Sequence, residues 1–305
     1  MIDLLIIGAG PVGLYTAFYA CLNNLNVVVV EIDTIVGGAP KKMYPEKYIY
    51  DIPCILETTG SKIIEQLLEQ LATQKNWKIE KGVVIQEIKK KEEYYQVFSN
   101  KQIFECKNII FATGYGAFKY NKIDDHLIND KQTYKKIHYE INDLNIYKNK
   151  KIIICGGGNS AIDYGLLLEP LVKNIKLIHH NNKLKALSTN VEKLKSKKKV
   201  NFLLDANIES IGINKIEVLI NEKKQIFDYD YLLVFYGTTT IESPLANLGI
   251  FNEMHKINVD ENMQSLRFKN IYAIGACNDK GYHNLMVNGF SQGTIVIDYI
   301  VNNKK

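Results

Sequence analysis

The sequence has almost no arginine. Of its 38 lysine and arginine residues only Arg267 is an arginine, and the formal net charge is a mild +5. A solvated lysine surface accounts for this charge better than a dedicated face for an acidic partner. The basic run Lys193–Lys199 carries no aromatic residues between its charges, so the sequence does not predict nucleic-acid binding.

Cysteine pairs and long apolar runs are also missing. The five cysteines form no C-x-x-C and have no metal-ligand spacing with the histidines, so we expect neither disulfide chemistry nor a metal site. No apolar run is long enough to span a bilayer, and the chain enters a strand without a basic leader, which predicts a cytoplasmic protein without a membrane partner. With 305 residues, 46% of them apolar and 23% charged, the chain is long enough for two globular domains.

The most informative stretch is Asp3–Asp33. A short apolar run leads into Gly8-Ala9-Gly10-Pro11-Val12-Gly13, an apolar helix follows, and the next β-branched run ends on Glu31. This order of strand, G-x-G-x-x-G, helix, strand and acid is typical of βαβ units that bind a dinucleotide. The glycines permit a tight turn, close approach to a pyrophosphate and close helix packing, and the helix N-terminus favours phosphate. Glu31 is expected to accept hydrogen bonds from ribose hydroxyls.

The same pattern occurs a second time. The strand Lys151–Cys155 precedes Gly156-Gly157-Gly158-Asn159-Ser160-Ala161, with alanine in the third glycine position, and the copies are offset by 148 residues, the distance from Gly8 to Gly156. The strand Asn270–Gly275 and the helix Asn288–Val301 lie outside the second copy, so we expect them to complete the first domain. The sequence thus predicts an α/β fold with two Rossmann-like, three-layer dinucleotide-binding domains, the second inserted into the first.

Other segments are assigned from periodicity and turn residues. We expect a loop after Glu31, a helix over Ser61–Lys75 capped by Ser61, and a buried strand over Asn108–Gly114 that matches Tyr231–Gly237. Two antiparallel meanders are predicted, with strands at Val83–Ile88, Tyr94–Ser99 and Gln102–Phe104 in the first copy, and at Ile208–Ile211, Ile216–Ile220 and Gln225–Phe227 in the second.

The segment Met43–Pro53 contains three tyrosines near two prolines, which predicts a stiff, turn-rich loop. Position alone does not distinguish a packed surface loop from an aromatic platform for a flat ring with Asp51 near its polar edge. Neither glycine copy brings a nucleophile with a base or paired carboxylates, so the chemistry is expected to reside in cofactors. Two dinucleotide sites suggest a hydride donor and an acceptor, NAD(P)H and FAD.

Taken together, these motifs resemble those of the thioredoxin-reductase-like ferredoxin/flavodoxin–NADP⁺ reductases over essentially the whole chain. The run Tyr44–Asp51 is the most specific part of the resemblance. The family implies an FAD-dependent NAD(P)H oxidoreductase that is a homodimer and passes electrons to ferredoxin or flavodoxin. It also implies that 1–116 with 241–305 bind FAD and that 117–240 bind NAD(P)H. The insertion predicted from the repeat places the chain crossings near Gly116–Lys119 and Thr238–Pro244.

The resemblance also assigns site residues, with no catalytic residue beyond the flavin itself. Tyr44 would stack on the isoalloxazine, Asp51 would lie near the ring, and the backbone around Val84–Ile85 would meet adenine. The FAD residues are Gly8, Gly10, Pro11, Val12, Gly13, Glu31, Ala39, Tyr44, Tyr48, Asp51, Val84, Ile85, Thr113, Gly114, Gly275 and Ala276. The nicotinamide dinucleotide residues are Gly157, Gly158, Asn159, Ser160, Ala161, His179, His180 and Lys185.

Three departures from the family pattern qualify these assignments. Tyr139–Asp143 stands where thioredoxin reductases carry a redox C-x-x-C, so dithiol exchange is excluded. His179-His180-Asn181-Asn182 replaces the usual His-Arg-Arg-Asp, and lysine lacks the bidentate fork of arginine, so NADPH is only modestly favoured over NADH. Ala276 replaces the usual aspartate beside the flavin. A flavin-binding electron relay or partner-dependent protein that has lost efficient NAD(P)H use is therefore kept as the alternative. The chain stops at Lys305, without the C-terminal extension that covers the flavin in several members of the family, so we expect one flavin face to be open to solvent or a partner.

Overall fold

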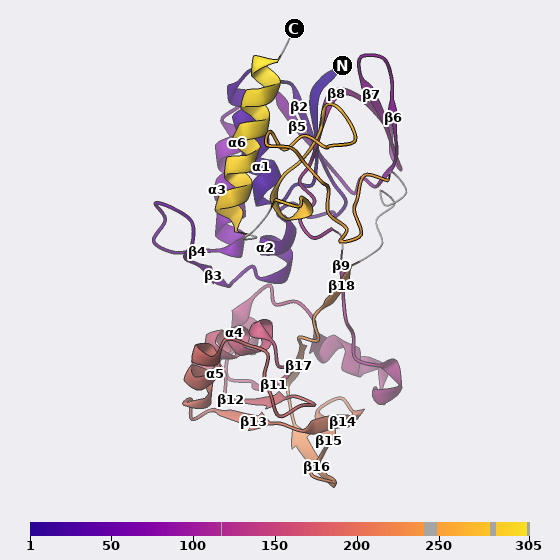
Figure 1. The fold of residues 1–305 in the computed structure, drawn as a ribbon. Coiled ribbons are helices and arrows are strands. Elements are labelled where there is room, and N and C mark those ends of the chain that lie inside the picture. Colours follow the sequence, from indigo (N-terminus) through magenta and orange to yellow (C-terminus); the bar gives the residue numbers. More distant parts are fainter. Residues whose placement is uncertain (117, 241–248, 281–284, 304–305) are drawn as a thin grey trace. The chain divides into compact units, whose positions relative to one another are not determined.

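The computed structural model describes residues 1–116, 118–240, 249–280 and 285–303. It divides the chain into two units (Figure 1): unit 1 contains Met1–Phe118 and Thr240–Lys305, and unit 2 contains Lys119–Thr239. Unit 2 is therefore an insertion in unit 1. The boundaries expected from the sequence lie close to these, although residue 117 of the first expected crossing and residues 241–244 of the second lie outside the described residues.

The described part of unit 1 is built on a seven-stranded sheet in the order β5-β2-β1-β8-β7-β6, with β19 also paired to β8. The parallel strands consist largely of β-branched and apolar residues because parallel sheets are covered on both faces. Parallel pairing joins β1 (Ile2–Ile7), β2 (Val27–Glu31), β5 (Trp77–Lys81), β8 (Ile103–Phe111) and β19 (Ile271–Ala273), whereas β6 (Ile85–Lys90) and β7 (Tyr95–Ser99) are antiparallel.

Strand β8 corrects one sequence prediction. Gln102–Phe104 and Asn108–Gly114 were predicted as separate strands, but one strand runs from Ile103 to Phe111. Its first part pairs with β7 and its later part with β1 and β19. Lys107 and Asn108 interrupt the apolar pattern because both reach Asp3, with Lys107 Nζ 3.2 Å from its carboxylate and Asn108 Nδ2 3.1 Å from its carbonyl oxygen.

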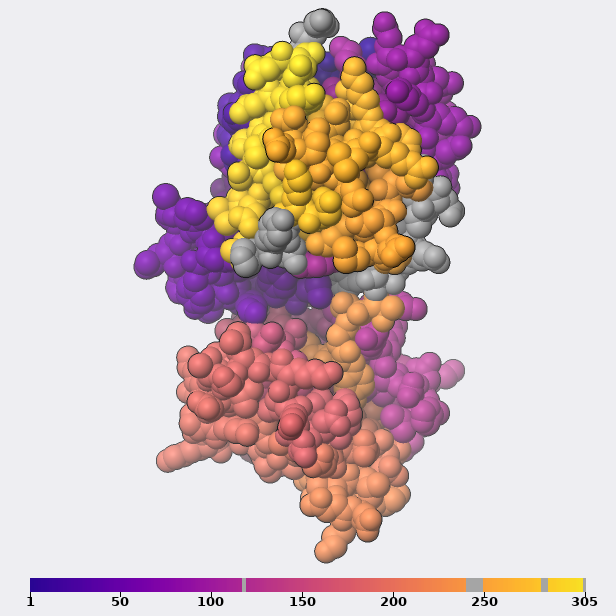
Figure 2. Space-filling view, viewed as in Figure 1, coloured from indigo at the N-terminus to yellow at the C-terminus, as the bar shows by residue number. Residues whose placement is uncertain are grey.

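The helix α6 (Met286–Asn302) packs against α1 (Pro11–Leu22) in unit 1. A β-carbon added at Gly289 would overlap Val12, and one added at Gly293 would overlap Thr16. The predicted last strand and helix therefore complete the first domain, as expected. Figure 2 shows the surface of α6 in yellow beside the orange segment 249–280, which short β-bridges tie together.

Two local predictions in unit 1 are wrong. Helix α3 (Gly60–Ala72) is capped by Thr59, whose Oγ1 accepts from the Lys62 amide at 3.3 Å, and Ser61 already lies inside the helix. The segment after Glu31, predicted as a loop, contains the short helix α2 (Gly38–Met43). The strands β3 (Tyr48–Ile49) and β4 (Thr58–Thr59) pair, so the segment Met43–Pro53, predicted as a loop, contains one short strand.

Unit 2 has a five-stranded parallel sheet in the order β10-β17-β11-β12-β13. Alternate residues of β11 face opposite sides, because Ile152 and Ile154 belong to one apolar cluster and Ile153 and Cys155 to another. The first cluster includes residues of α4 (Asn159–Leu168) and α5 (Ser188–Lys195), and the second includes residues of the predicted meander. The strands are β10 (Ile137–His138), β11 (Lys151–Cys155), β12 (Asn174–Ile178), β13 (Val200–Leu203) and β17 (Tyr231–Val234), and the meander is β14 (Ala206–Ile211), β15 (Lys215–Ile220) and β16 (Lys223–Asp228).

The two sheets confirm the internal repeat. The order β5-β2-β1-β8 in unit 1 corresponds to β13-β12-β11-β17 in unit 2, both in space and along the chain. The fifth strands occupy matching places in the two sheets, but β19 follows β8 in the chain whereas β10 precedes β11. The remaining elements of unit 2 are the 3-10 turns η1 (Asp125–Leu127), η2 (Lys131–Lys136) and η3 (Leu144–Tyr147), and the strands β9 (Phe118–Tyr120) and β18 (Thr238–Thr240) lie at the chain crossings. None of the described helices is long and apolar enough to cross a membrane.

Candidate dinucleotide sites

The first glycine loop joins β1 to α1 and leaves space at its middle glycine. Gly8 has φ +110°, and a β-carbon there would lie 2.5 Å from the Ala112 carbonyl oxygen. A β-carbon at Gly13 would overlap the Gly8 carbonyl, whereas at Gly10 the nearest atom would be 3.9 Å away. No side chain caps α1 at Gly10, so its first N–H groups remain available to an anion. The loop fits a pyrophosphate at Gly10, with Pro11 and Val12 starting the helix beside it.

Glu31 ends β2 directly beside this loop. Only 6% of the residue is exposed; its Oε2 accepts from the Ala9 amide at 2.8 Å and its Oε1 from the Asp33 amide at 3.1 Å. Burial raises the pKa of this carboxyl, and the backbone hydrogen bonds oppose the rise. Each carboxylate oxygen has a second lone pair, so Glu31 can still accept from a ribose hydroxyl. The carboxylate thus also ties the glycine loop to β2, a role that the sequence pattern did not reveal.

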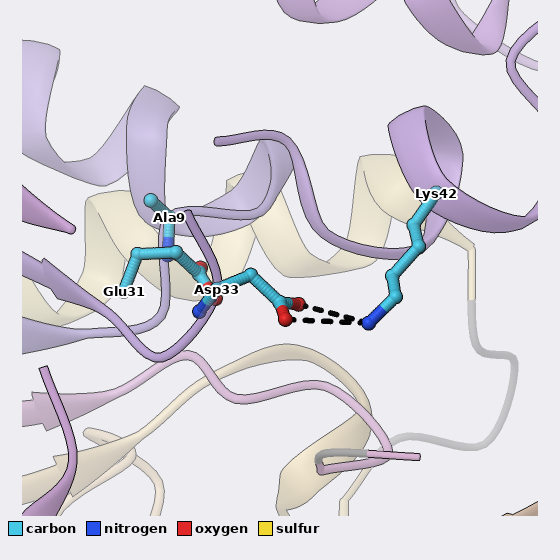
Figure 3. Close-up of polar contacts among 4 residues, drawn as sticks. All are labelled: Ala9, Glu31, Asp33 and Lys42. Carbon is cyan, nitrogen blue, oxygen red and sulfur yellow. Dashed lines mark hydrogen bonds and ion pairs between the residues drawn. The ribbon is translucent and has the colours of Figure 1, made fainter. Parts of the chain in front are cut away.

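Two further glycines, Gly37 and Gly38, contact the first glycine loop. The Gly37 amide donates to the Ala9 carbonyl at 2.9 Å, and a β-carbon at Gly38 would lie 3.0 Å from Gly10 Cα. Figure 3 shows the ion pair that holds α2 nearby, in which Lys42 Nζ lies 3.3 and 3.2 Å from the two Asp33 carboxylate oxygens. The sequence analysis missed these contacts, although two adjacent glycines shortly after β2 were the available signal. Ala39 lies in the first turn of α2 and is half-buried.

The tyrosine-rich loop forms a cavity with the start of α6. The cavity has a volume of about 460 Å³. Tyr44 is half-buried, and burial, followed by Tyr115 and Asp51, raises the pKa of its phenol to about 12. Its ring is therefore neutral at ordinary pH. The lining residues are Tyr44, Lys47, Tyr48, Ile49, Tyr50, Asp51, Leu285 and Met286, so the structure brings the predicted Tyr44, Tyr48 and Asp51 together with two residues that the sequence analysis did not select.

The turn after β19 is ordered by amide side chains. Gly275 has φ +74°, and its N–H donates to Gln292 Oε1 at 2.7 Å. Asn278 Nδ2 donates to the same oxygen at 2.9 Å and to the Ala273 carbonyl at 3.0 Å. Gln292 and Asn278 are both buried. Ala276 has no carboxylate to offer a cofactor, so the amide pair holds the turn in place but does not replace that group.

Asp279 and the turn after β8 lie close to the turn after β19 in the chain or in space. The exposed Asp279 accepts from the Val259 amide at 3.2 Å, so its carboxylate is engaged with segment 249–280. Thr113 and Gly114 form the turn after β8, where the Gly116 amide donates to the Thr113 carbonyl at 2.9 Å. Thr113 lies beside the buried thiol of Cys277, since a hydrogen bond with Thr113 opposes the effect of burial on the pKa of that thiol.

The structure engages both backbone groups of Val84, the residue expected to meet adenine. Its N–H donates to Asn100 Oδ1 at 2.8 Å, and its carbonyl accepts from the Asn100 amide at 3.1 Å. Ile85 is buried at the start of β6. An adenine contact with the Val84 backbone would therefore have to replace Asn100 or share the carbonyl with it, and that contact stays a prediction.

The second glycine loop joins β11 to α4. Gly156 has φ +139°, and a β-carbon there would lie 2.5 Å from the Phe235 carbonyl oxygen, whereas nothing lies within 4 Å of a β-carbon at Gly158. No side chain caps α4 at Gly158. The buried Ala161 replaces the third glycine, and the first-turn hydrogen bond from Ile162 to Gly158 is 3.3 Å, compared with 2.9 Å between the corresponding Leu14 and Gly10. The loop fits a second pyrophosphate, with a slightly loosened helix start.

Other predicted residues of this site are distributed around the loop. Ser160 is exposed at the start of α4, while Asn159 Oδ1 accepts from the Leu187 amide at 3.0 Å. The Lys185 amide donates to the Gly157 carbonyl at 2.7 Å, which ties the exposed segment after β12 to the loop. His180 is exposed, with its Nε2 3.0 Å from Asn181 Nδ2.

His179 follows β12 and lies directly over the loop. A β-carbon at Gly157 would lie 2.5 Å from His179 Nε2, so only glycine fits beneath this ring. His179 is 7% exposed, and its buried Nε2 has no hydrogen-bond partner. Burial lowers the pKa of this imidazole, and the nearby His180 lowers it further. An unpartnered polar atom at the edge of an open phosphate loop fits a site built for a ligand.

Two Rossmann-like units, each with an open glycine loop at a helix N-terminus, are the architecture of a protein built for two dinucleotides. The chain belongs to the pyridine nucleotide-disulphide oxidoreductase family, whose model matches residues 2–293. It is accordingly an FAD-dependent NADPH oxidoreductase in which one Rossmann-like unit is inserted into the other.

Curated relatives are similar to the chain in sequence, and solved structures are similar to it in fold. The chain is 34% identical over 310 residues to ferredoxin–NADP reductase 2 of Bacillus subtilis (strain 168), covering 97% of this chain and 90% of that protein. It is 32% identical over 307 residues to ferredoxin–NADP reductase of Streptococcus gordonii, with coverages of 98% and 94%. Thioredoxin reductase from Lactococcus lactis in its FR conformation has a similar fold, with a TM-score of 0.77, 20% identity and coverages of 99% and 98%. That from T. acidophilum has a TM-score of 0.78, 19% identity and the same coverages.

Proposed function

We propose that this protein is a reductase that passes electrons from NADPH through FAD to a ferredoxin-type acceptor. The observation that carries the proposal is the pair of open glycine loops, one beside Glu31 and the other beside His179, in a chain without a C-x-x-C. The relatives named ferredoxin–NADP reductase support the direction and the acceptor. When bound, FAD accepts a two-electron hydride and releases electrons singly.

The residues of unit 1 would bind and orient the flavin. The Gly8–Gly13 loop would hold the pyrophosphate, and Glu31 would accept from the adenosine ribose. Tyr44 offers a neutral ring to the isoalloxazine because its phenol has a pKa of about 12. The assignment of 1–116 with 241–305 to FAD and of 117–240 to the nucleotide is part of this proposal, as are the other predicted site residues.

The nature of the acceptor and the assembly are also proposed. Ferredoxin is the favoured partner because relatives carry its name, and flavodoxin is the second candidate. We further expect a cytoplasmic homodimer. Sedimentation of the purified FAD-bound protein would test the assembly: a single species of 34.8 kDa would exclude the dimer.

Anaerobic titration of the purified yellow protein tests the enzymatic step. NADPH is expected to bleach the flavin band at near-stoichiometric addition, and the reduced protein should then reduce ferredoxin. If neither NADPH nor NADH bleaches the band, the reductase proposal fails. Parallel assays with flavodoxin would rank the acceptors. A protein that gains no flavin absorbance on addition of FAD would contradict the cofactor assignment itself.

A second candidate is a flavin-binding electron relay that uses NAD(P)H poorly. It is favoured by one observation, the replacement of arginines by the exposed His180-Asn181 pair, which offers no bidentate fork to a phosphate. The same titration separates the two functions, because a relay would bleach only with a chemical reductant or a reduced partner protein.

A further inference from the structure

The internal repeat places His179 at the position of Glu31. Glu31 lies 23 residues after Gly8, and His179 lies 23 residues after Gly156, in both cases just beyond or at the end of the second strand of the unit. In unit 1 the carboxylate accepts from the amide of Ala9 in the glycine loop, whereas in unit 2 the imidazole lies over the corresponding Gly157. At this position the first unit has a carboxylate, which only accepts hydrogen bonds, and the second unit has an imidazole, whose nitrogen atoms can accept or donate.

The role of the His179 ring depends on its proton. Nε2 has no hydrogen-bond partner, and the Lys183 backbone near the ring raises the pKa of the imidazole. A neutral ring with its proton on Nδ1 presents Nε2 as an acceptor, whereas in the protonated ring Nε2 is a donor.

The surroundings keep the ring neutral when no ligand is bound. Burial is the largest influence that lowers the pKa of His179, followed by His180, whose ring centroid is 4.6 Å away, and then by the charge of Lys185. The backbone of His179 bonds to Leu203 and Ala206, which carry no charge. The charged groups recorded around the ring are thus all cationic among the described residues, and an anion is what would allow His179 to hold a second proton.

We propose that His179 selects between the two nicotinamide dinucleotides by its protonation state. The neutral ring accepts a hydrogen bond from the free ribose 2′-hydroxyl of NADH, and the protonated ring donates one to the 2′-phosphate of NADPH. This inference rests on the proposed nucleotide site in unit 2. In other dinucleotide-binding units an acid after the second strand accepts a hydrogen bond from the free 2′-hydroxyl of NAD. In this chain His179 takes that position after β12. Nε2 is buried, and the centroid of the exposed His180 ring lies 4.6 Å from that of His179, so access of a ligand to Nε2 requires a local movement of this segment.

The expected pH dependence has a definite sign. Binding of the 2′-phosphate raises the pKa of His179 and takes up a proton, so the preference for NADPH falls as pH rises through the histidine range. A phosphate monoester has its own second pKa near ~6 and gains charge as pH rises, which strengthens its attraction to Lys185. The two effects have opposite signs, so a variant without a titrating side chain at position 179 separates them.

Binding of NADP⁺ and NAD⁺ to the FAD-loaded protein, measured by calorimetry across the histidine range, tests the proposal without turnover. In the wild type the affinity ratio of NADP⁺ to NAD⁺ should fall as pH rises through the titration of His179. The total fall should be about tenfold for each unit by which the bound phosphate raises the pKa of His179. In His179→Gln, which keeps an acceptor and a donor but does not titrate, the ratio should stay level or rise. His126→Gln, an exposed histidine of the same unit, is the matched control and should behave as the wild type.

A second measurement needs no variant. Calorimetry of the wild type in buffers with different ionisation enthalpies should show net proton uptake with NADP⁺ and none with NAD⁺. An equal pH dependence in wild type and His179→Gln, or NADP⁺ binding without proton uptake, would overturn the proposal. Failure of the wild type to bind either nucleotide at any pH would instead contradict the proposed function.

Discussion

Gln292, in the first half of α6, accepts a hydrogen bond from the Gly275 amide at 2.7 Å and thereby holds the turn after β19. The same oxygen accepts from Asn278 at 2.9 Å. The turn at Gly275–Asn278, which is expected to lie beside the flavin, is thus held by helix α6, which follows it in the chain. These hydrogen bonds fix the backbone of the turn even though Ala276 replaces the usual aspartate.

Gln292→Leu is expected to weaken FAD binding. The change leaves the half-buried Gly275 N–H and one buried Asn278 donor without an acceptor, and an unsatisfied buried group costs about 1–3 kcal/mol of stability. Rearrangement of the turn to relieve this cost would alter the wall expected beside the flavin and lower the affinity for FAD. The measurement is FAD dissociation together with the visible flavin spectrum, which reports on the ring's surroundings. Gln66→Leu, an exposed glutamine on α3, is the control. Equal affinity and equal spectra in both variants would show that the amide pair does not shape the site.

Substitution of Glu31 is expected to separate its two roles. Glu31→Ala removes the acceptor for the Ala9 amide and for the ribose, so FAD retention should fall by about tenfold or more. Glu31→Gln keeps one acceptor oxygen and should retain more flavin than the alanine variant. Unchanged retention in Glu31→Ala, measured by ultrafiltration, would contradict the assignment of this carboxylate to FAD.

The pKa of Glu31 predicts a pH dependence for flavin retention. Burial raises this pKa above the ordinary 4.5, so the carboxyl becomes protonated at a higher pH than an exposed acid. Only the carboxylate offers all its lone pairs to the ribose, so FAD should be lost as pH falls through that raised pKa. Glu31→Gln does not titrate, and its retention curve should be flatter over the same range. Parallel curves for the two proteins would contradict this explanation.

Tyr44 should act through its ring and not through its hydroxyl. Its pKa of about 12 keeps the phenol neutral, so Tyr44→Phe should retain FAD with little change. Tyr44→Ala removes the stacking partner and should increase the fluorescence of bound flavin, because an adjacent electron-rich ring quenches the excited state. Steady-state fluorescence of the FAD-loaded variants measures this. Strong quenching that survives in Tyr44→Ala would place the flavin ring elsewhere.

Packing of α6 on α1 should be sensitive to a single methyl group. In Gly289→Ala the added β-carbon overlaps Val12, and overpacking of this kind costs about 1–3 kcal/mol. A lower thermal midpoint is expected, and it should recover in Gly289→Ala/Val12→Ala, where the overlapping methyl groups are removed. A double variant less stable than Gly289→Ala alone would show that the strain lies elsewhere.

The features set by residues adjacent in the chain were predicted correctly, whereas the features that depend on distant residues were not. Both glycine loops, Lys151–Cys155 and the inserted order were predictable because strand, glycine turn and helix are adjacent in the chain. Ser61 was predicted to cap α3, and only the start of the helix in the folded chain shows that Thr59 does so. The charged residues Glu105 and Lys107 hid the continuity of β8, since their side chains pair with the distant Gln96 and Asp3.

The sequence alone determined the two-domain dinucleotide-binding fold, its repeat and the glycine positions, because local conformation and hydrophobic pattern encode them directly. Tertiary structure decided how the site residues are used. It assigned the Glu31 carboxylate to the Ala9 amide, engaged Val84 with Asn100, linked Gln292 to Gly275 and left His179 Nε2 without a partner. A hydrogen bond depends on the distance between two groups in space, and residues far apart in the chain acquire that distance only when the sheet and its helices pack.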